Sequence, residues 1–281
     1  MLLSRVRGCC CAGVVWRHLL ATVSAGLVLS GVCAGSAFAA EYRFGINAEV
    51  SYKESESEVR QRYVPFLQEL GKLTGHQFVF HPVYSDKVEA ALAGKAYDFL
   101  LIHTHAALKA EMAHKFQLVG FTDDRKNNQV YFFVKPDSTL KSLPDVGSAR
   151  MGVPGLQSWA TATAQGALKA GGVTAKPTLV STRYQDAVPV MLELHAASVG
   201  VTRSKKLVDD HVARNAVRVM HVTPAMPLNA LIAAPEVPAV TVEAVRDAIA
   251  AMAKSKAFDA LAFKGLTYSA EQSKTLHDFY R

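Results

Sequence analysis

The sequence has few cysteines, and all of them lie near its N-terminus. The 281 residues contain four, Cys9, Cys10, Cys11 and Cys33. This distribution excludes a disulfide framework, an all-cysteine zinc site and a thiol nucleophile from the rest of the chain.

Other absences narrow the functional classes further. The sequence has no G-x-x-x-x-G-K-[ST], G-x-G-x-x-G, G-x-S-x-G or H-E-x-x-H motif, so phosphate-loop, dinucleotide, serine-hydrolase and zinc-protease chemistry have no support. The net charge is only +7, and no basic run is interleaved with aromatics, so no nucleic acid partner is expected. Half of the residues are hydrophobic, which excludes disorder and allows one large or two medium domains.

The first 39 residues have the features of an export signal. Arg5, Arg7 and Arg17 form a basic start, and residues 19–32 form a short apolar stretch. Ala37–Ala39 then offers small residues at both specificity positions of a signal peptidase site. We expect cleavage after Ala39, which would make the exported, periplasmic protein free of thiols. The alternative is an N-terminal anchor that is never cleaved.

The remainder alternates short apolar runs with amphipathic stretches, which predicts an α/β fold. The expected strands are 42–46, 77–81, 98–102, 117–121, 129–135, 150–153, 178–181, 198–202, 217–221 and 228–233. The strands and helices fall into two successive series along the chain. These suggest two lobes, each a mixed sheet flanked by helices, joined by two hinge crossovers. We expect lobe 1 to contain residues 40–133 and 225–281, and lobe 2 to contain residues 134–224. Ligands of open α/β sheets bind beyond the carboxyl ends of strands, so function should be sought in those loops.

His103, Thr104 and His105 follow the expected strand 98–102. Residues two apart on a strand share a face, so both imidazoles are candidates for contact with an anion or a metal. A metal would need further ligands, for which His81, His114 and Glu111 are the candidates. The plainer alternative is that Thr104 caps the next helix and both histidines are solvated.

Three more strand ends carry polar residues. Gln157 and Ser158 lie in a strand-to-helix turn, where free backbone N–H groups favour anions. Tyr184 and Gln185 follow the expected strand 178–181, and Thr202 and Arg203 follow 198–202. Arg203 suits a carboxylate or phosphate-like group. Each has a plainer interpretation as an ordinary start of a surface helix.

With these loops identified, the mature sequence resembles the phosphate/phosphite/phosphonate family of periplasmic solute-binding proteins that serve ABC importers. The resemblance rests on the order and spacing of several segments: 44–47, 62–66, 89–92, 134–138, 141–143, 185–188 and 224–229. It implies a two-lobed, hinge-closing type 2 periplasmic binding protein.

The resemblance is weaker at the ligand positions. Leu156, Gln157 and Ser158 stand where the family usually carries Ser-Thr-Ser, and Gln185 stands where a histidine is common. His103–His105 replaces a loop of Gly-Pro and small residues, and an acidic position is replaced near Arg203. The resemblance therefore implies a small anion without fixing a phosphonate.

The expected function is capture of that anion for an ABC permease, by a monomer that is not an enzyme and needs no cofactor or metal. A sensor kinase is an alternative partner, and a metal-binding protein or metallohydrolase built on His103 and His105 is an alternative class. The expected ligand contacts are Tyr52, His103, Thr104, His105, Gln157, Ser158, Tyr184, Gln185, Thr202 and Arg203.

Overall fold

The computed structural model describes residues 40–47 and 55–281, which form two β-sheets with flanking helices. The expected cleavage site and Tyr52 lie outside the described residues. No helix in these two ranges is long and apolar enough to cross a membrane.

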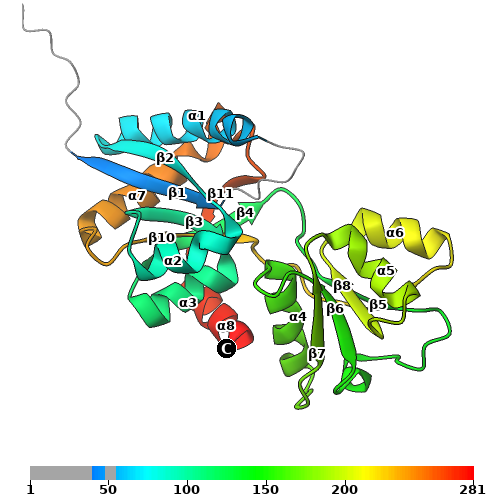
Figure 1. Ribbon diagram of the computed structural model, residues 1–281. Coiled ribbons are helices and arrows are strands. Elements are labelled where there is room, and N and C mark those ends of the chain that lie inside the picture. The colour runs from blue at the N-terminus through cyan, green and yellow to red at the C-terminus, as the bar shows by residue number, and fades with distance from the viewer. Residues whose placement is uncertain (1–39, 48–54) are drawn as a thin grey trace, which may run out of the picture. The chain divides into compact units, whose positions relative to one another are not determined.

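The first sheet has six strands in the order β11-β4-β10-β3-β1-β2. β1 pairs in parallel with β2 and β3, whereas β10 is antiparallel to both β3 and β4. Helices α1 and α7 lie on one face of this sheet and α2 and α3 on the other (Figure 1). Its elements are β1 (Glu41–Asn47), α1 (Glu56–Thr74), β2 (Gln77–Val83), α2 (Val88–Ala93), β3 (Phe99–His103), α3 (Thr104–His114), β4 (Gln117–Asp124), β10 (Asn229–Ala233), α7 (Ala239–Ala251), β11 (Phe263–Thr267) and α8 (Ala270–Tyr280).

The second sheet has five strands in the order β7-β6-β8-β5-β9. β6 is parallel to β7 and β8, and β5 is antiparallel to β8 and β9. Its elements are β5 (Tyr131–Val134), β6 (Arg150–Pro154), α4 (Trp159–Ala170), β7 (Thr178–Thr182), α5 (Val188–Glu193), β8 (Val199–Thr202), α6 (Lys205–Ala213) and β9 (Arg218–Val222).

Each sheet is covered by apolar side chains on both faces. All five residues of β3 are buried, as expected for a central strand with helices on either side. Around the second sheet, Trp159 and Ala164 of α4 belong to one buried cluster, while Val188 of α5 and Val208 of α6 belong to another. These cores fix the strand ends from which the loops leave.

β1 to β10 form where the apolar pattern predicts strands, and both sheets are mixed, so the fold-class prediction is confirmed. The expected lobe boundary at 133/134 falls inside β5, because Tyr131 and Phe132 already pair with β8 in the five-stranded sheet. The chain therefore crosses between the sheets after β4 and before β5, and again between β9 and β10. β11 was not expected from the sequence.

Candidate functional site

A pocket of about 210 Å³ lies where the carboxyl ends of β1 and β3 face the start of α4. We call it the strand-end pocket. Its position agrees with the rule that open α/β sheets bind ligands beyond the carboxyl ends of parallel strands. It is lined by Asn47, Ser85, Val88, Glu89, His103, His105, Ala106, Lys109, Leu156, Gln157, Ala162 and Gln165.

The first sheet contributes polar groups that are held in place by neighbours. Ser85 Oγ, after β2, donates to Asn47 Oδ1 at the end of β1, at 3.3 Å. His103, the last residue of β3, has Nδ1 2.9 Å from Asn229 Oδ1 on the adjacent strand β10. An amide oxygen can only accept, so His103 Nδ1 carries the proton. These contacts fix the orientation of the Asn47, Ser85 and His103 side chains.

His105 lies in the first turn of α3, and its ring stacks near that of His103 with centroids 6.0 Å apart. Burial and the nearby His103 lower the pKa of His105 to about 3, and Lys109 acts in the same direction. A hydrogen bond to the Gln157 backbone acts in the opposite direction and raises the pKa. The imidazole is therefore neutral near pH 7. The positive end of the helix dipole acts in the same direction, because it disfavours a cation at this position.

Lys109 and Glu89 give the pocket one charge of each sign. Lys109 lies one turn after His105 on α3, and its Nζ is 2.9 Å from Glu89 Oε1 on α2. Both side chains are more than half exposed, so water screens the attraction between them.

The second sheet contributes the turn between β6 and α4. Gly155 adopts a φ of +85°, a conformation that favours glycine. The chain then places Leu156 and Gln157 at the pocket, and Ser158 becomes the N-cap of α4 by accepting from Thr161 N at 3.1 Å. The hydroxyl of Ser158 thus serves the helix start and is not among the groups that line the pocket.

The structure brings three of the expected contacts together at the strand-end pocket, namely His103, His105 and Gln157. Thr104 is fully buried, and its hydroxyl donates to the Pro227 carbonyl at 2.8 Å.

The remaining expected contacts form a separate group at the end of β8. Gln185 Oε1 accepts from Thr202 Oγ1 at 2.7 Å and from Arg203 N at 2.9 Å. Tyr184 is exposed, with the Arg183 guanidinium 5.6 Å from its ring centre. This group fixes the turn between β8 and α6, and it is not among the described residues that line the strand-end pocket.

Sequence reasoning missed several lining residues, although signals for some were present. Asn47 ends an expected strand, so the strand-end rule applies to it as well. Lys109 lies four residues after His105 and therefore on the same helix face. Nothing in the sequence pattern indicates that Ser85, Glu89 and Gln165 meet there.

Among residues 40–47 and 55–281, no group of three or more His, Cys, Asp and Glu side chains is arranged to hold a metal ion. Within the same ranges, none of the residues expected to join His103 and His105 as ligands, namely His81, Glu111 and His114, forms such a group with them.

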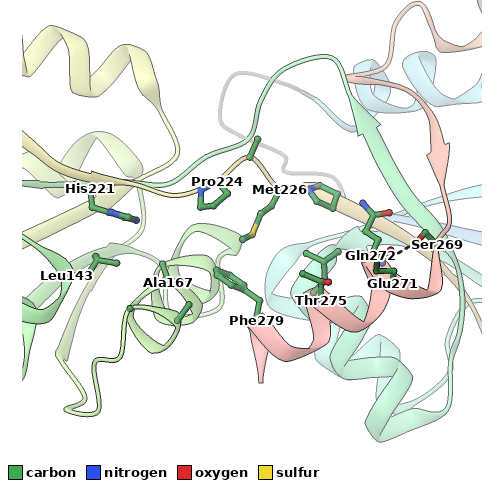
Figure 2. A pocket seen from close by; sticks show the side chains of 15 residues that line it. Leu143, Ala167, His221, Pro224, Met226, Ser269, Glu271, Gln272, Thr275 and Phe279 are labelled. Atoms are coloured by element: carbon green, nitrogen blue, oxygen red, sulfur yellow. Dashed lines mark hydrogen bonds between the residues drawn. The ribbon is translucent and has the colours of Figure 1, made fainter.

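A second, larger cavity of about 790 Å³ lies beside the segment that connects β9 to β10. We call it the crossover cavity. Figure 2 shows Pro224 and Met226 of the connecting segment, Ala167 of α4 and Phe279 of α8 around it. Its lining is mostly apolar, which distinguishes it from the strand-end pocket.

The family of periplasmic substrate-binding proteins of phosphonate ABC transporters matches residues 50–274. The chain belongs to this family. This substrate-binding protein is therefore the periplasmic solute-binding component of an ABC transporter for small anions. No curated protein matches it.

Solved structures share the fold of this substrate-binding protein. XAC2383 from Xanthomonas citri, solved with chloride, has a TM-score of 0.67 at 15% identity over 85% of this chain and 96% of that one. PhnD1 from Prochlorococcus marinus, solved with methylphosphonate, has a TM-score of 0.58 at 13% identity over 85% and 96%. PA3383 from Pseudomonas aeruginosa, a component of a phosphonate transporter, has a TM-score of 0.55 at 16% identity over 85% of each chain. At these identities the likeness establishes the fold alone.

Proposed function

We propose that this protein captures a phosphate, phosphite, small phosphonate or similar oxyanion in the strand-end pocket and delivers it to an ABC permease. The observation that carries the proposal is the convergence of two helix starts, those of α3 and α4, on one small pocket at the ends of β1 and β3. Residues 1–39 would be the export signal removed on secretion, and the mature protein would act as a monomer.

The chemistry of the pocket favours an anion. Helix N-termini present backbone N–H groups and a partial positive charge. Around them stand the amides of Asn47, Gln157 and Gln165 and the ammonium of Lys109. Such a pocket holds an oxyanion by many hydrogen bonds with little formal positive charge, in keeping with a neutral His105.

The volume of the pocket limits the size of the ligand. About 210 Å³ lies below the roughly 300–1,000 Å³ of pockets for drug-sized molecules. A tetrahedral oxyanion with at most a short substituent suits this space. PhnD1, with its methylphosphonate, offers a precedent of that size.

We propose binding without a covalent step. The groups supporting this are hydrogen-bond donors and acceptors fixed by neighbours, such as His103 on Asn229. No product would be released. If the protein closes on the ligand, the closure would be driven only by the difference in ligand affinity between the open and the closed conformation.

The test is a melting-temperature screen of the exported protein against phosphate, phosphite, methylphosphonate, sulfate and acetate. At least one oxyanion should raise the melting temperature, because a ligand that binds only the folded state stabilises it by mass action. Gln157→Ala should reduce the shift, whereas Tyr268→Phe, at an exposed tyrosine outside the pocket lining, should leave it unchanged. No shift with any anion would refute the proposal.

A further inference from the structure

The C-terminal helix α8 contacts the two helices that begin at the strand-end pocket. His277 Nε2 lies 2.8 Å from Glu111 Oε2 on α3. Three residues later, the Tyr280 hydroxyl lies 3.0 Å from Thr163 Oγ1 on α4. One short helix therefore joins a helix of the first sheet to a helix of the second.

The contact between α8 and α4 is close. A Cβ atom placed on Gly166 of α4 would lie 2.5 Å from Phe279 Cε1 and 2.8 Å from the Phe279 carbonyl oxygen. Only glycine permits this approach. Thr163 and Gly166 of α4 both contact α8. Their sequence neighbours Ala162 and Gln165 line the strand-end pocket, and Ala167 lines the crossover cavity.

Tyr280 has contacts in three directions. Besides Thr163, its hydroxyl lies 3.8 Å from Met226 Sδ in the segment connecting β9 to β10. Its ring centroid is 6.1 Å from that of His105. Tyr280 itself is not among the described residues that line the strand-end pocket. It thus touches α4, the crossover segment and a pocket residue without reaching the ligand position.

We propose that Tyr280 is a positioning residue that holds α3 and α4 in the arrangement that completes the strand-end pocket. The inference rests on the proposed function in so far as it concerns ligand affinity. A pocket built from both helices is competent only while they keep this arrangement, and the apparent affinity falls with the competent fraction. Tyr280 therefore sets affinity from outside the pocket.

The test compares Tyr280→Phe, which removes only the hydroxyl, with the control Tyr268→Phe. Titration with methylphosphonate should give a dissociation constant about two- to tenfold higher for Tyr280→Phe, the range expected for one net hydrogen bond. Thr163→Val should raise the dissociation constant as well, and the double variant should not exceed Tyr280→Phe, because the hydrogen bond to Thr163 is already absent in Tyr280→Phe. Tyr268→Phe should match the wild type.

A second readout reports where α3 lies relative to the helices of the second sheet, and it needs no ligand. Because the expected mature chain lacks cysteine, spin labels can be placed on exposed positions with Met112→Cys on α3 and Val212→Cys on α6. Tyr280→Phe should shift or broaden the distance distribution between them in the ligand-free protein. A merely local structural role would lower the melting temperature without changing this distribution.

The two readouts separate the inference from the proposed function. An unchanged distance distribution in Tyr280→Phe, or an unchanged dissociation constant, overturns the role of Tyr280. If the wild type binds neither methylphosphonate nor any other oxyanion, the proposed function fails, and the distance distribution alone decides the inference.

Discussion

At the scale of single residues, the strand-end pocket shows how position decides what a side chain contributes. His103 and His105 are two residues apart, yet His103 is buried and held by Asn229 on the next strand, whereas His105 is partly exposed in the first turn of α3 and lies against Lys109 and the backbone of Gln157. Burial disfavours the charged form of an imidazole. Two histidines that look equivalent in the sequence therefore have different surroundings in the fold.

The lowered pKa of His105 predicts a specific loss of stability in acid. Its pKa is about 3 in the folded protein and near 6.5 when unfolded, so the unfolded chain binds a proton first as the pH falls. The stabilisation is complete above about pH 6.5 and is lost towards about pH 3, by about 1.4 kcal/mol per pH unit.

Urea unfolding of the wild type and His105→Gln between about pH 7 and pH 4 measures this effect. The difference in unfolding free energy between the wild type and His105→Gln should shrink as the pH falls, because glutamine does not titrate. The control His221→Gln should show a weaker trend, since burial lowers the pKa of His221 without the neighbouring charges that act on His105. If the unfolding free energies of the wild type and His105→Gln change in parallel with pH, the lowered pKa of His105 is refuted.

The sequence could identify part of the pocket and not the rest. The strand-end rule located His103, His105 and Gln157 because they follow central strands. It could not tell that the hydroxyls of Ser158 and Thr202 are used internally, one to cap α4 and the other to bind Gln185. Which partner satisfies a hydroxyl depends on tertiary contacts that periodicity does not encode.

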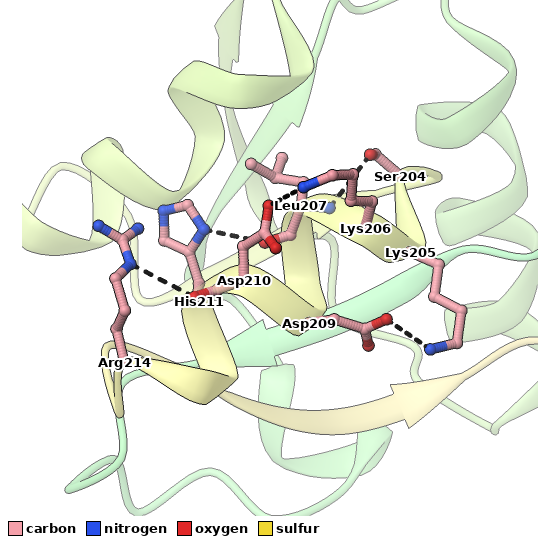
Figure 3. A network of polar contacts seen from close by, with 8 residues as sticks. All are labelled: Ser204, Lys205, Lys206, Leu207, Asp209, Asp210, His211 and Arg214. Atoms are coloured by element: carbon pink, nitrogen blue, oxygen red, sulfur yellow. Dashed lines mark hydrogen bonds and ion pairs between the residues drawn. The ribbon is translucent and has the colours of Figure 1, made fainter.

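At the scale of elements, α6 shows which polar contacts matter for a surface helix. Figure 3 shows Lys205 paired with Asp209 and Lys206 paired with Asp210, one turn apart, and Ser204 at the helix start. The ion pairs are exposed and therefore screened by water. Ser204 Oγ instead accepts from Leu207 N at 3.3 Å and satisfies an otherwise unpaired helix donor.

Two substitutions on α6 should therefore differ in effect. Ser204→Ala should lower the free energy of unfolding by about 1 kcal/mol, the usual cost of losing an N-cap. Lys206→Ala should change it little, and any change should vanish at high salt. Chemical denaturation at low and high ionic strength measures both, and a larger loss for Lys206→Ala would contradict the capping argument.

The packing of α4 on α8 predicts that Gly166 does not tolerate a side chain. Gly166→Ala places a methyl group against Phe279 and should cost about 1–3 kcal/mol of stability, as overpacking does. Gly265→Ala is the control, because among the described residues no atom beyond its chain neighbours lies within 4 Å of the added Cβ there. Equal unfolding midpoints for the two variants would contradict the close contact.

The element missed by the sequence analysis has a physical explanation. β11 is short, contains Gly265, and in the part of the chain that the structure describes pairs with β4 alone, through an irregular register. Glycine weakens a strand signal, and an edge strand needs little apolar alternation. The central strands, by contrast, carry continuous apolar runs that predict them clearly.

At the scale of the whole molecule, the family match and the two mixed sheets agree with the sequence-based expectation of a periplasmic binding protein. The points at which the chain crosses from one sheet to the other are harder to predict than the strands and helices themselves. β5 is as apolar as the strands of the first sheet, and only its pairing with β8 and β9 assigns it to the second. The ligand is likewise less predictable than the fold, because it depends on a few loop residues.

The central claim is that the strand-end pocket binds an anion, and the Lys109–Glu89 pair allows a test of the sign of the ligand charge. Isothermal titration with phosphate, phosphite and methylphosphonate should detect one anion per chain in the wild type. Glu89→Gln should tighten binding and Lys109→Met should weaken it, each by about three- to tenfold for a partly screened charge. No binding of any of these anions, or tighter binding in Lys109→Met than in Glu89→Gln, would contradict the account.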